Sequence, residues 1–253
     1  MIDSSSLESV KIPLKLGNSP INQAIISICY ESNFPDTALF GLLIDVFSEN
    51  GCRAEEMPLL QIPKQIREND KNLKYQELYR CIKDVNNNTH YVFGIGSNII
   101  RFIVSGKYES WNSWRNFFEP IIREIKEKGI IKSVGNISLR YCDVFDKDYI
   151  SDFNFEVKLF NQLLTEQNLS LNTSFDFNGI KINLKIGNTV FVNGVEKENS
   201  SLIDIDCVKT ENLNDEEFFK KYQNILEDSH LANKQVFFSL VNEELLKLLE
   251  PEW

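Results

Sequence analysis

The sequence has no apolar run as long as the roughly 18 to 20 residues that a membrane-spanning helix requires. The first residues, MIDSSSLESVKIPLKLGNSP, contain neither the basic nor the apolar segment of a secretory signal. We therefore expect a cytoplasmic location and no membrane partner. A chain of 253 residues with 42% hydrophobic content is long enough to bury a substantial core.

Cysteine and histidine are also sparse. The five cysteines are scattered and never occur as C-x-x-C, which argues against a disulfide framework and against a thiolate zinc site. We expect them to be small buried residues. Two histidines leave little room for a histidine-based triad or a histidine-rich metal site. Of the two, His230 is a candidate for ligand or partner binding.

The glycine motifs that bind nucleotides or present a nucleophile are missing as well. GIGSN at 94–98 lacks a third glycine, and neither G-x-x-x-x-G-K-[ST] nor G-x-S-x-G occurs. We expect no cofactor, and the sequence leans away from an enzyme.

Charge is distributed unevenly along the chain. The net charge is −10; residues 1–150 contain 18 Lys and Arg against 19 Asp and Glu, whereas residues 151–253 contain 9 against 18. Binding to a nucleic-acid backbone needs clustered basic residues, so we do not expect the acidic half to bind one directly. A basic protein partner is compatible with this charge, as is a homo-oligomer.

The first half reads as a strand, a helix, three strands and a second helix. Residues 24–30, AIISICY, are β-rich, and Asp36 is a natural N-cap for a helix that ends near Gly51. Three β-rich segments follow, separated by turns rich in Asn and Gly. Residues 108–129 then predict a helix whose apolar stripe faces the core, with Trp111, Trp114, Phe118, Ile121, Ile122 and Ile125 at helical spacing.

The same order of elements is predicted again in the second half. Residues 137–145 predict a strand, residues 152–167 a helix with Phe153, Val157, Phe160 and Leu164 on one stripe, and three strands follow before a helical region from Asp215. The fold class expected is α+β, with two successive β-α-β-β-β-α units whose antiparallel sheets carry helices on one side. The halves are residues 1–132 and 133–253, packed as one globular unit.

Asp204 and Asp206 are the best carboxylate pair in the sequence. In SLIDIDCVK, the strand period of two places both acids on one face and Ile203, Ile205 and Cys207 on the other. Such a pair is a candidate metal site, and a solvated outer sheet face explains the same alternation.

Arg140 and Asp143 are the remaining candidates for ligand or partner binding. In LRYCDVF they lie on opposite faces of one predicted strand, so we expect no direct salt bridge between them. Arg140 lies near the predicted join of the halves, where we expect it to be available to an acidic group of the other half.

Four segments, AIISICY, SWNSWRNFF, ISLRYCDVF and DSHLANKQVFFSLVNEELLKLLEP, occur in this order between about residues 20 and 251. In these segments the chain resembles a sporadically distributed family of uncharacterised prokaryotic proteins. The resemblance implies no catalytic residue set. It does imply genes that travel on mobile elements, as toxin–antitoxin and phage-defence components do.

Three functions remain open at this point. The first is a non-catalytic accessory or neutralising protein that binds another protein, in a mobile defence or toxin–antitoxin cassette. The second is a binder of a small ligand held at the junction of the halves. The third is a metal-dependent hydrolase that uses Asp204 and Asp206.

Overall fold

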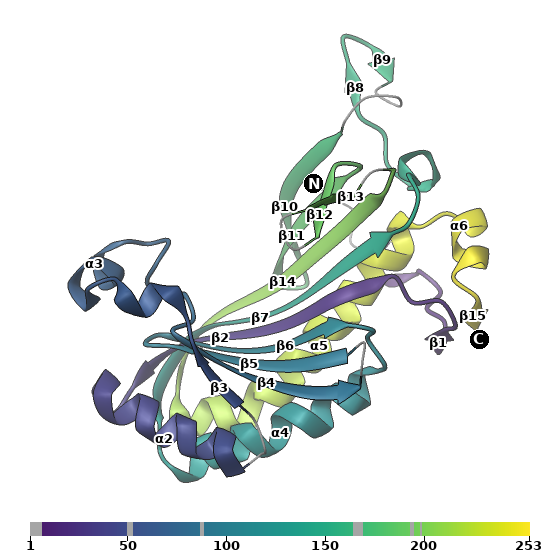
Figure 1. The fold of residues 1–253 in the computed structure, drawn as a ribbon. Helices are drawn as coiled ribbons and strands as arrows, with labels where there is room; N and C mark the ends of the chain where they lie inside the picture. The colour runs from purple at the N-terminus through teal and green to yellow at the C-terminus, as the bar shows by residue number, and fades with distance from the viewer. Residues whose placement is uncertain (1–6, 50–52, 87–88, 164–168, 193–194, 198) are drawn as a thin grey trace. The chain divides into compact units, whose positions relative to one another are not determined.

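The computed structural model describes residues 7–49, 53–86, 89–163, 169–192, 195–197 and 199–253. It has an α+β fold with a large antiparallel sheet, in the strand order β10-β11-β14-β7-β2-β6-β5-β4-β3 (Figure 1). The contact pattern divides the chain into two compact units: unit 1 is residues 1–22, 140–208 and 227–253, and unit 2 is residues 23–139 and 209–226. No helix in the described ranges is long and apolar enough to cross a membrane.

Unit 2 contains most of the helices and strands of the first half, together with parts of two later strands and of a later helix. Its elements are most of β2 (Ile21–Ser32), α2 (Asp36–Glu49), β3 (Arg53–Glu56), the 3-10 helix η1 (Pro58–Gln61), α3 (Lys64–Asn69), β4 (Tyr79–Asn86), β5 (Thr89–Gly96), β6 (Ile99–Gly106), α4 (Trp111–Glu127), the first part of β7 (Ile131–Phe145), the end of β14 (Ser201–Asn214) and the beginning of α5 (Asp215–Leu240).

Helix α4 confirms the predicted core stripe for Trp114 and Phe118, whereas Trp111 is only half-buried. Ser110 caps the helix, because its Oγ accepts a hydrogen bond of 3.0 Å from the backbone N–H of Ser113. Trp114 is fully buried, and the Phe118 ring lies 5.7 Å from that of Phe102 on β6. Figure 1 shows α2 and α4 on the same face of β4, β5 and β6. Burying each such ring contributes about 1.5–3 kcal/mol, which explains why this face of the helix is apolar.

Two glycines of β5 allow a polar segment to approach the opposite face of this sheet. A Cβ added at Gly94 would lie 2.3 Å from Cδ of Glu77, and one at Gly96 would lie 2.1 Å from the carbonyl oxygen of Gln76. Glu77 is buried and forms ion pairs with Arg80 and Arg101. The buried, ion-paired carboxylate of Glu77 therefore fills the space beside Gly94, and a backbone carbonyl group fills the space beside Gly96.

Unit 1 contains the other elements. They are β1 (Lys15–Leu16), the 3-10 helix η2 (Ile150–Asp152), β8 (Lys158–Leu159), β9 (Gln162–Leu163), β10 (Ser170–Phe177), β11 (Ile180–Gly187), β12 (Val190–Val192), β13 (Val195–Lys197), α6 (Glu243–Leu248), β15 (Pro251–Glu252), the first part of β14 and the later parts of β7 and α5.

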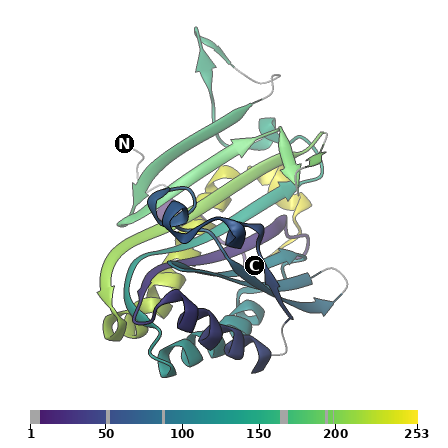
Figure 2. The same ribbon diagram turned by 60° about the vertical axis from the view of Figure 1, so that its left-hand side comes forward.

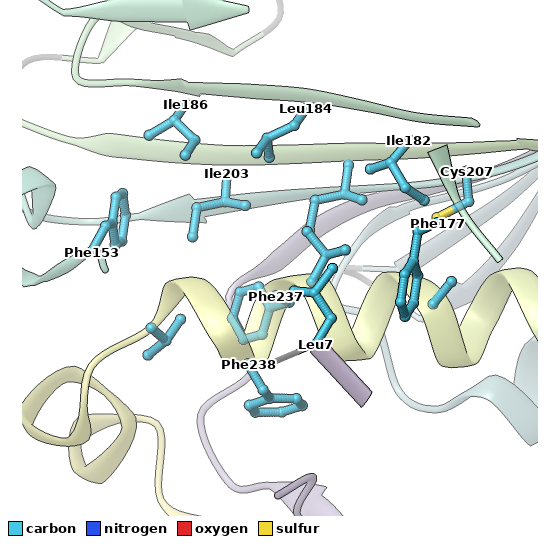
Figure 3. Close-up of a cluster of buried hydrophobic side chains, with 14 of the residues drawn as sticks. Leu7, Phe153, Phe177, Ile182, Leu184, Ile186, Ile203, Cys207, Phe237 and Phe238 are labelled. Atoms are coloured by element: carbon cyan, nitrogen blue, oxygen red, sulfur yellow. The ribbon is translucent and has the colours of Figure 1, made fainter. Parts of the chain in front are cut away.

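The core of unit 1 lies between its strands and α5. Every second residue of β11 and three alternate residues of β14 enter this core. Figure 3 shows Ile182, Leu184, Ile186 and Ile203 on the side of the sheet that carries Phe237 and Phe238 of the helix. Strand alternation explains the pattern, since the intervening residues then lie on the opposite face. The strand members of the cluster are Phe145, Phe177, Ile180, Ile182, Leu184, Ile186, Ile203, Ile205 and Cys207.

The predicted helix at 152–167 is wrong over the part that the structure describes. Residues 150–152 form η2, and 158–163 form the hairpin β8–β9; residues 164–167 lie outside the described ranges. Asn154 instead binds the end of α5, because its Nδ2 donates to the carbonyl oxygens of Ser239 at 3.1 Å and Val241 at 3.3 Å. These hydrogen bonds satisfy carbonyl groups that the end of a helix leaves unpaired. They stabilise the observed backbone more than the apolar spacing of residues 152–167 stabilises a helix.

Without a helix in the described part of 152–167, the second half does not repeat the predicted order of elements of the first half. The α+β class is confirmed, but the described residues between β7 and β10 contain no α-helix that would correspond to α2. Phe160, predicted to lie on a helical stripe, is 90% exposed in the β8–β9 turn, where it and Asn161 have φ angles of 51° and 61°. The boundary between residues 132 and 133 stays a prediction, and each compact unit is built from separate segments.

Candidate functional site

All five sequence-predicted site residues belong to unit 1. They lie on two strands and one helix: Arg140 and Asp143 on β7, Asp204 and Asp206 on β14, and His230 on α5. The fold separates them into two groups. One group lies on the sheet face that points away from the core, and the other lies in or beside the core.

The alternation predicted for β14 is observed. Ile203, Ile205 and Cys207 are fully buried in the core cluster. Asp204 and Asp206 therefore lie on the opposite face of the strand.

Arg140 binds Asp204 at two points. Its Nε lies 2.7 Å from Oδ1 and its Nη2 lies 2.5 Å from Oδ2. Asp204 belongs to the same half of the chain, 133–253, and not to the other half as predicted, because β14 pairs with β7 in the sheet. The hydrogen bonds that Arg140 donates to Asp204 are the main cause of its raised pKa. The negative charge of Asp204 raises this pKa further, and burial opposes the increase. Both oxygens of Asp204 are occupied by a permanent cation, so its charge is neutralised inside the protein.

Asp206 belongs to a short row of polar side chains that crosses three strands. Its Oδ2 accepts a hydrogen bond of 3.3 Å from Nδ2 of Asn183, whose Oδ1 accepts one of 2.9 Å from Oγ of Ser174. The register explains the row, because Asn183 lies opposite Asp206 on β14 and opposite Ser174 on β10. Sequence reasoning missed Asn183, although the alternation in IKINLKIG places it on this polar face.

A cation at Asp204 and Asp206 would have to compete with Arg140. The described part of the chain contains no group of three or more His, Cys, Asp or Glu side chains able to hold a metal ion. Metal binding by the two acids stays a prediction, and their present arrangement favours an internal ion pair over a divalent cation.

Asp143 is buried on the core side of β7, where it is 2% exposed. Burial raises the pKa of its carboxyl group well above the usual value, and the charge of Asp204 adds to the effect. Among the described residues, no basic side chain forms an ion pair with it. A buried carboxyl group without a cation is favoured in its neutral, protonated form. Arg140 and Asp143 lie on opposite faces of β7, as expected.

His230 lies within α5, which continues without a break from Asp215 to Leu240. Its Nδ1 is 2.9 Å from the hydroxyl oxygen of Tyr141 on β7, and the two rings meet edge to face at a centroid distance of 5.8 Å. Burial, together with the charge of Lys234, lowers the pKa of His230 to about 4. The imidazole is therefore neutral near pH 7 and joins helix to strand.

Comparison with protein-family models and with curated proteins finds no match for this chain.

Proposed function

We propose that this protein is a non-catalytic binding protein that recognises a basic protein partner through unit 1. The observation that supports the proposal is the charge of the folded units. Unit 1 contains 10 Lys and Arg against 19 Asp and Glu, a net charge of −9, whereas unit 2 contains 17 against 18, a net charge of −1. Three separate segments are thus brought together in one strongly acidic unit.

The exposed acids of unit 1 are well placed to attract a cationic surface. Asp146, Asp228, Glu243 and Glu250 are all exposed. An unbalanced field of this kind accelerates association with a basic protein and opposes approach of a nucleic-acid backbone. The acidic surface of unit 1 fits a neutralising or accessory role in a mobile defence or toxin–antitoxin cassette, because such a component binds and masks or positions another protein.

A three-bait experiment in the native host tests the proposal. The baits are the wild-type chain, a unit 1 variant with Asp146→Lys, Asp228→Lys and Glu243→Lys, and a unit 2 variant with Asp45→Lys, Glu109→Lys and Glu127→Lys. All six acids are exposed, so both variants change the net charge equally. We expect one stoichiometric partner on the wild-type and unit 2 baits and its loss from the unit 1 bait, by mass spectrometry of the eluates.

Two results would contradict the proposal. One is the absence of any stoichiometric partner on the wild-type bait. The other is a partner that all three baits retain equally, since binding would then be independent of the acidity of unit 1. Thermal unfolding of each bait checks that the substitutions leave the fold intact.

A further inference from the structure

Strand β10 is an edge strand of the sheet in unit 1. It pairs with β11 residue for residue over all eight positions, from Ser170 with Gly187 to Phe177 with Ile180, without a register shift. Figures 1 and 2 both show a neighbouring strand on one side of β10 only. In the described part of the chain, its backbone forms hydrogen bonds to β11 alone. Half of its backbone N–H and C=O groups therefore point outward along the edge.

This edge has few of the features that usually protect an edge strand, and Asp176 is its one charged residue. Its sequence, SLNTSFDF, contains no proline and no lysine, and its pairing contains no bulge. The opposite edge of the sheet, β3, has only four residues, RAEE, three of them charged. A short charged strand discourages further pairing, whereas a regular strand of eight residues is a template for it.

Among the described residues, the core of unit 1 leaves two apolar side chains of β10 partly exposed. Leu171 and Phe175 pack against the core cluster but remain partly exposed. Thr173, between them on the same face, is exposed. A strand added outside β10 would place alternate apolar side chains next to Leu171 and Phe175 and would extend the core.

The geometry points to β10 as the docking site for an extended, basic segment of a partner protein, which adds one strand to the sheet. This inference rests on the proposed function and names where the partner binds. Main-chain hydrogen bonds supply affinity in this mode of recognition, and side chains of alternating character supply specificity. The partner strand carries apolar residues toward Leu171 and Phe175 and Lys or Arg toward Asp176.

Charge favours a basic partner over a second copy of the chain at this edge. Unit 1 has a net charge of −9, and pairing of two copies through β10 would bring two such units together. Like charges at an interface disfavour association, whereas a basic segment reduces the field of unit 1.

Two variants with the same change in charge test the docking site in the full-length chain. Thr173→Lys places a charge on the core side of the edge, which is a device that natural edge strands use against pairing. Ser174→Lys places the same charge on the outer face, one residue away. Both residues are exposed, and thermal unfolding checks that each variant folds.

The probe is a labelled peptide of alternating lysine and valine, as long as the eight residues of β10. Its control is the same peptide with every second backbone nitrogen methylated, which keeps the charge and removes the hydrogen-bond donors on one edge. We expect fluorescence anisotropy to show binding to the wild type and to Ser174→Lys, and about tenfold weaker binding to Thr173→Lys and by the methylated peptide. Hydrogen exchange should show protection at residues 170–177.

Equal weakening by both variants, equal binding of the methylated peptide, or protection away from β10 would overturn the inference. So would a wild-type dimer that Thr173→Lys converts to a monomer in light scattering, because a second copy would then occupy the edge. The outcomes remain separable from those of the bait experiment. If the peptide does not bind but the unit 1 bait loses its partner, the docking site is wrong and the proposed function is retained. If the peptide binds at β10 but no bait recovers a partner, the proposed function is wrong.

Discussion

Arg140 and Asp204 form a two-point ion pair on the outer sheet face of unit 1, with N–O distances of 2.7 and 2.5 Å. The Asp204 side chain is 10% exposed, whereas that of Arg140 is 43% exposed. The carboxylate has thus lost most of its water and depends on the guanidinium group for its hydrogen bonds. The two residues are 64 positions apart in sequence, so the pair fixes β7 against β14.

Replacing Arg140 by alanine should lower the free energy of unfolding by about 1–3 kcal/mol, because Asp204 remains buried without its partner. Urea unfolding at pH 7 measures the change. The double variant Arg140→Met with Asp204→Leu should recover most of the loss, since both charges are then removed. As a control, Lys220→Ala removes the fully exposed pair with Glu216 and should change nothing measurable. Equal effects of the two single variants would contradict the prediction.

His230 should make the protein less stable at mildly acidic pH. Its pKa in the folded state is lowered to about 4 from a usual value of 6.5. Between these values the unfolded chain binds the extra proton, so this contribution is fully present above about pH 6.5 and is lost as the pH falls toward 4. The loss is on the order of 2–3 kcal/mol. Urea unfolding between pH 7 and pH 4.5 should show a smaller decrease for His230→Gln than for the wild type; identical pH profiles would refute the assignment.

Asp143 should have the opposite dependence on pH. The pKa of its carboxyl group is raised in the folded state, chiefly by burial, so folding takes up a proton above about pH 3.8 and this group destabilises the fold progressively as the pH rises. The substitution Asp143→Asn keeps the size and shape of the side chain but removes the group that ionises. We expect the variant to be more stable than the wild type at pH 7 and to lose this advantage near pH 4. A variant that is less stable at both values would show that the carboxylate is needed in its charged form.

Two glycines of unit 2 provide a matched pair of substitutions. Gly94→Ala should destabilise the fold, because the new Cβ would lie 2.3 Å from Cδ of the buried Glu77. Gly41→Ala should stabilise it by about 0.5–1 kcal/mol, because Gly41 lies within α2 and a Cβ there meets nothing within 4 Å. Thermal unfolding compares the two. Stabilisation by both substitutions would show that the close approach of Glu77 does not restrict Gly94.

The parts of the fold that depend on one periodic pattern could be predicted from the sequence. The stripe of α4 needs only the helical period, and the two faces of β14 need only the strand period. The partner of Asp204 could not be found in this way, because the pairing of Arg140 with it depends on which strands are neighbours. The same holds for Asn183, whose contact with Asp206 is set by the register of β11 against β14.

The error at 152–167 has a different physical origin. The apolar spacing there fits a helix, but Phe153 has a place in the core of unit 1 and Asn154 binds carbonyl oxygens at the end of α5. The carbonyl groups that Asn154 binds are 85 and 87 positions away, and Phe153 forms a β-bridge with Val241. Local helix propensity contributes less free energy than burial of an aromatic ring, so the tertiary contacts determine the backbone conformation.

The interleaved composition of the two units has a consequence for synthesis of the chain. Unit 2 lacks residues 209–226 and unit 1 lacks residues 227–253 until the ribosome has made them. The sheet residues of both units therefore emerge before the α5 segments that cover their cores, and the nascent chain must keep these apolar faces from aggregating. A shortened messenger or a premature stop before α5 would leave neither unit with its full set of segments, so degradation rather than partial activity is the expected fate of such a product.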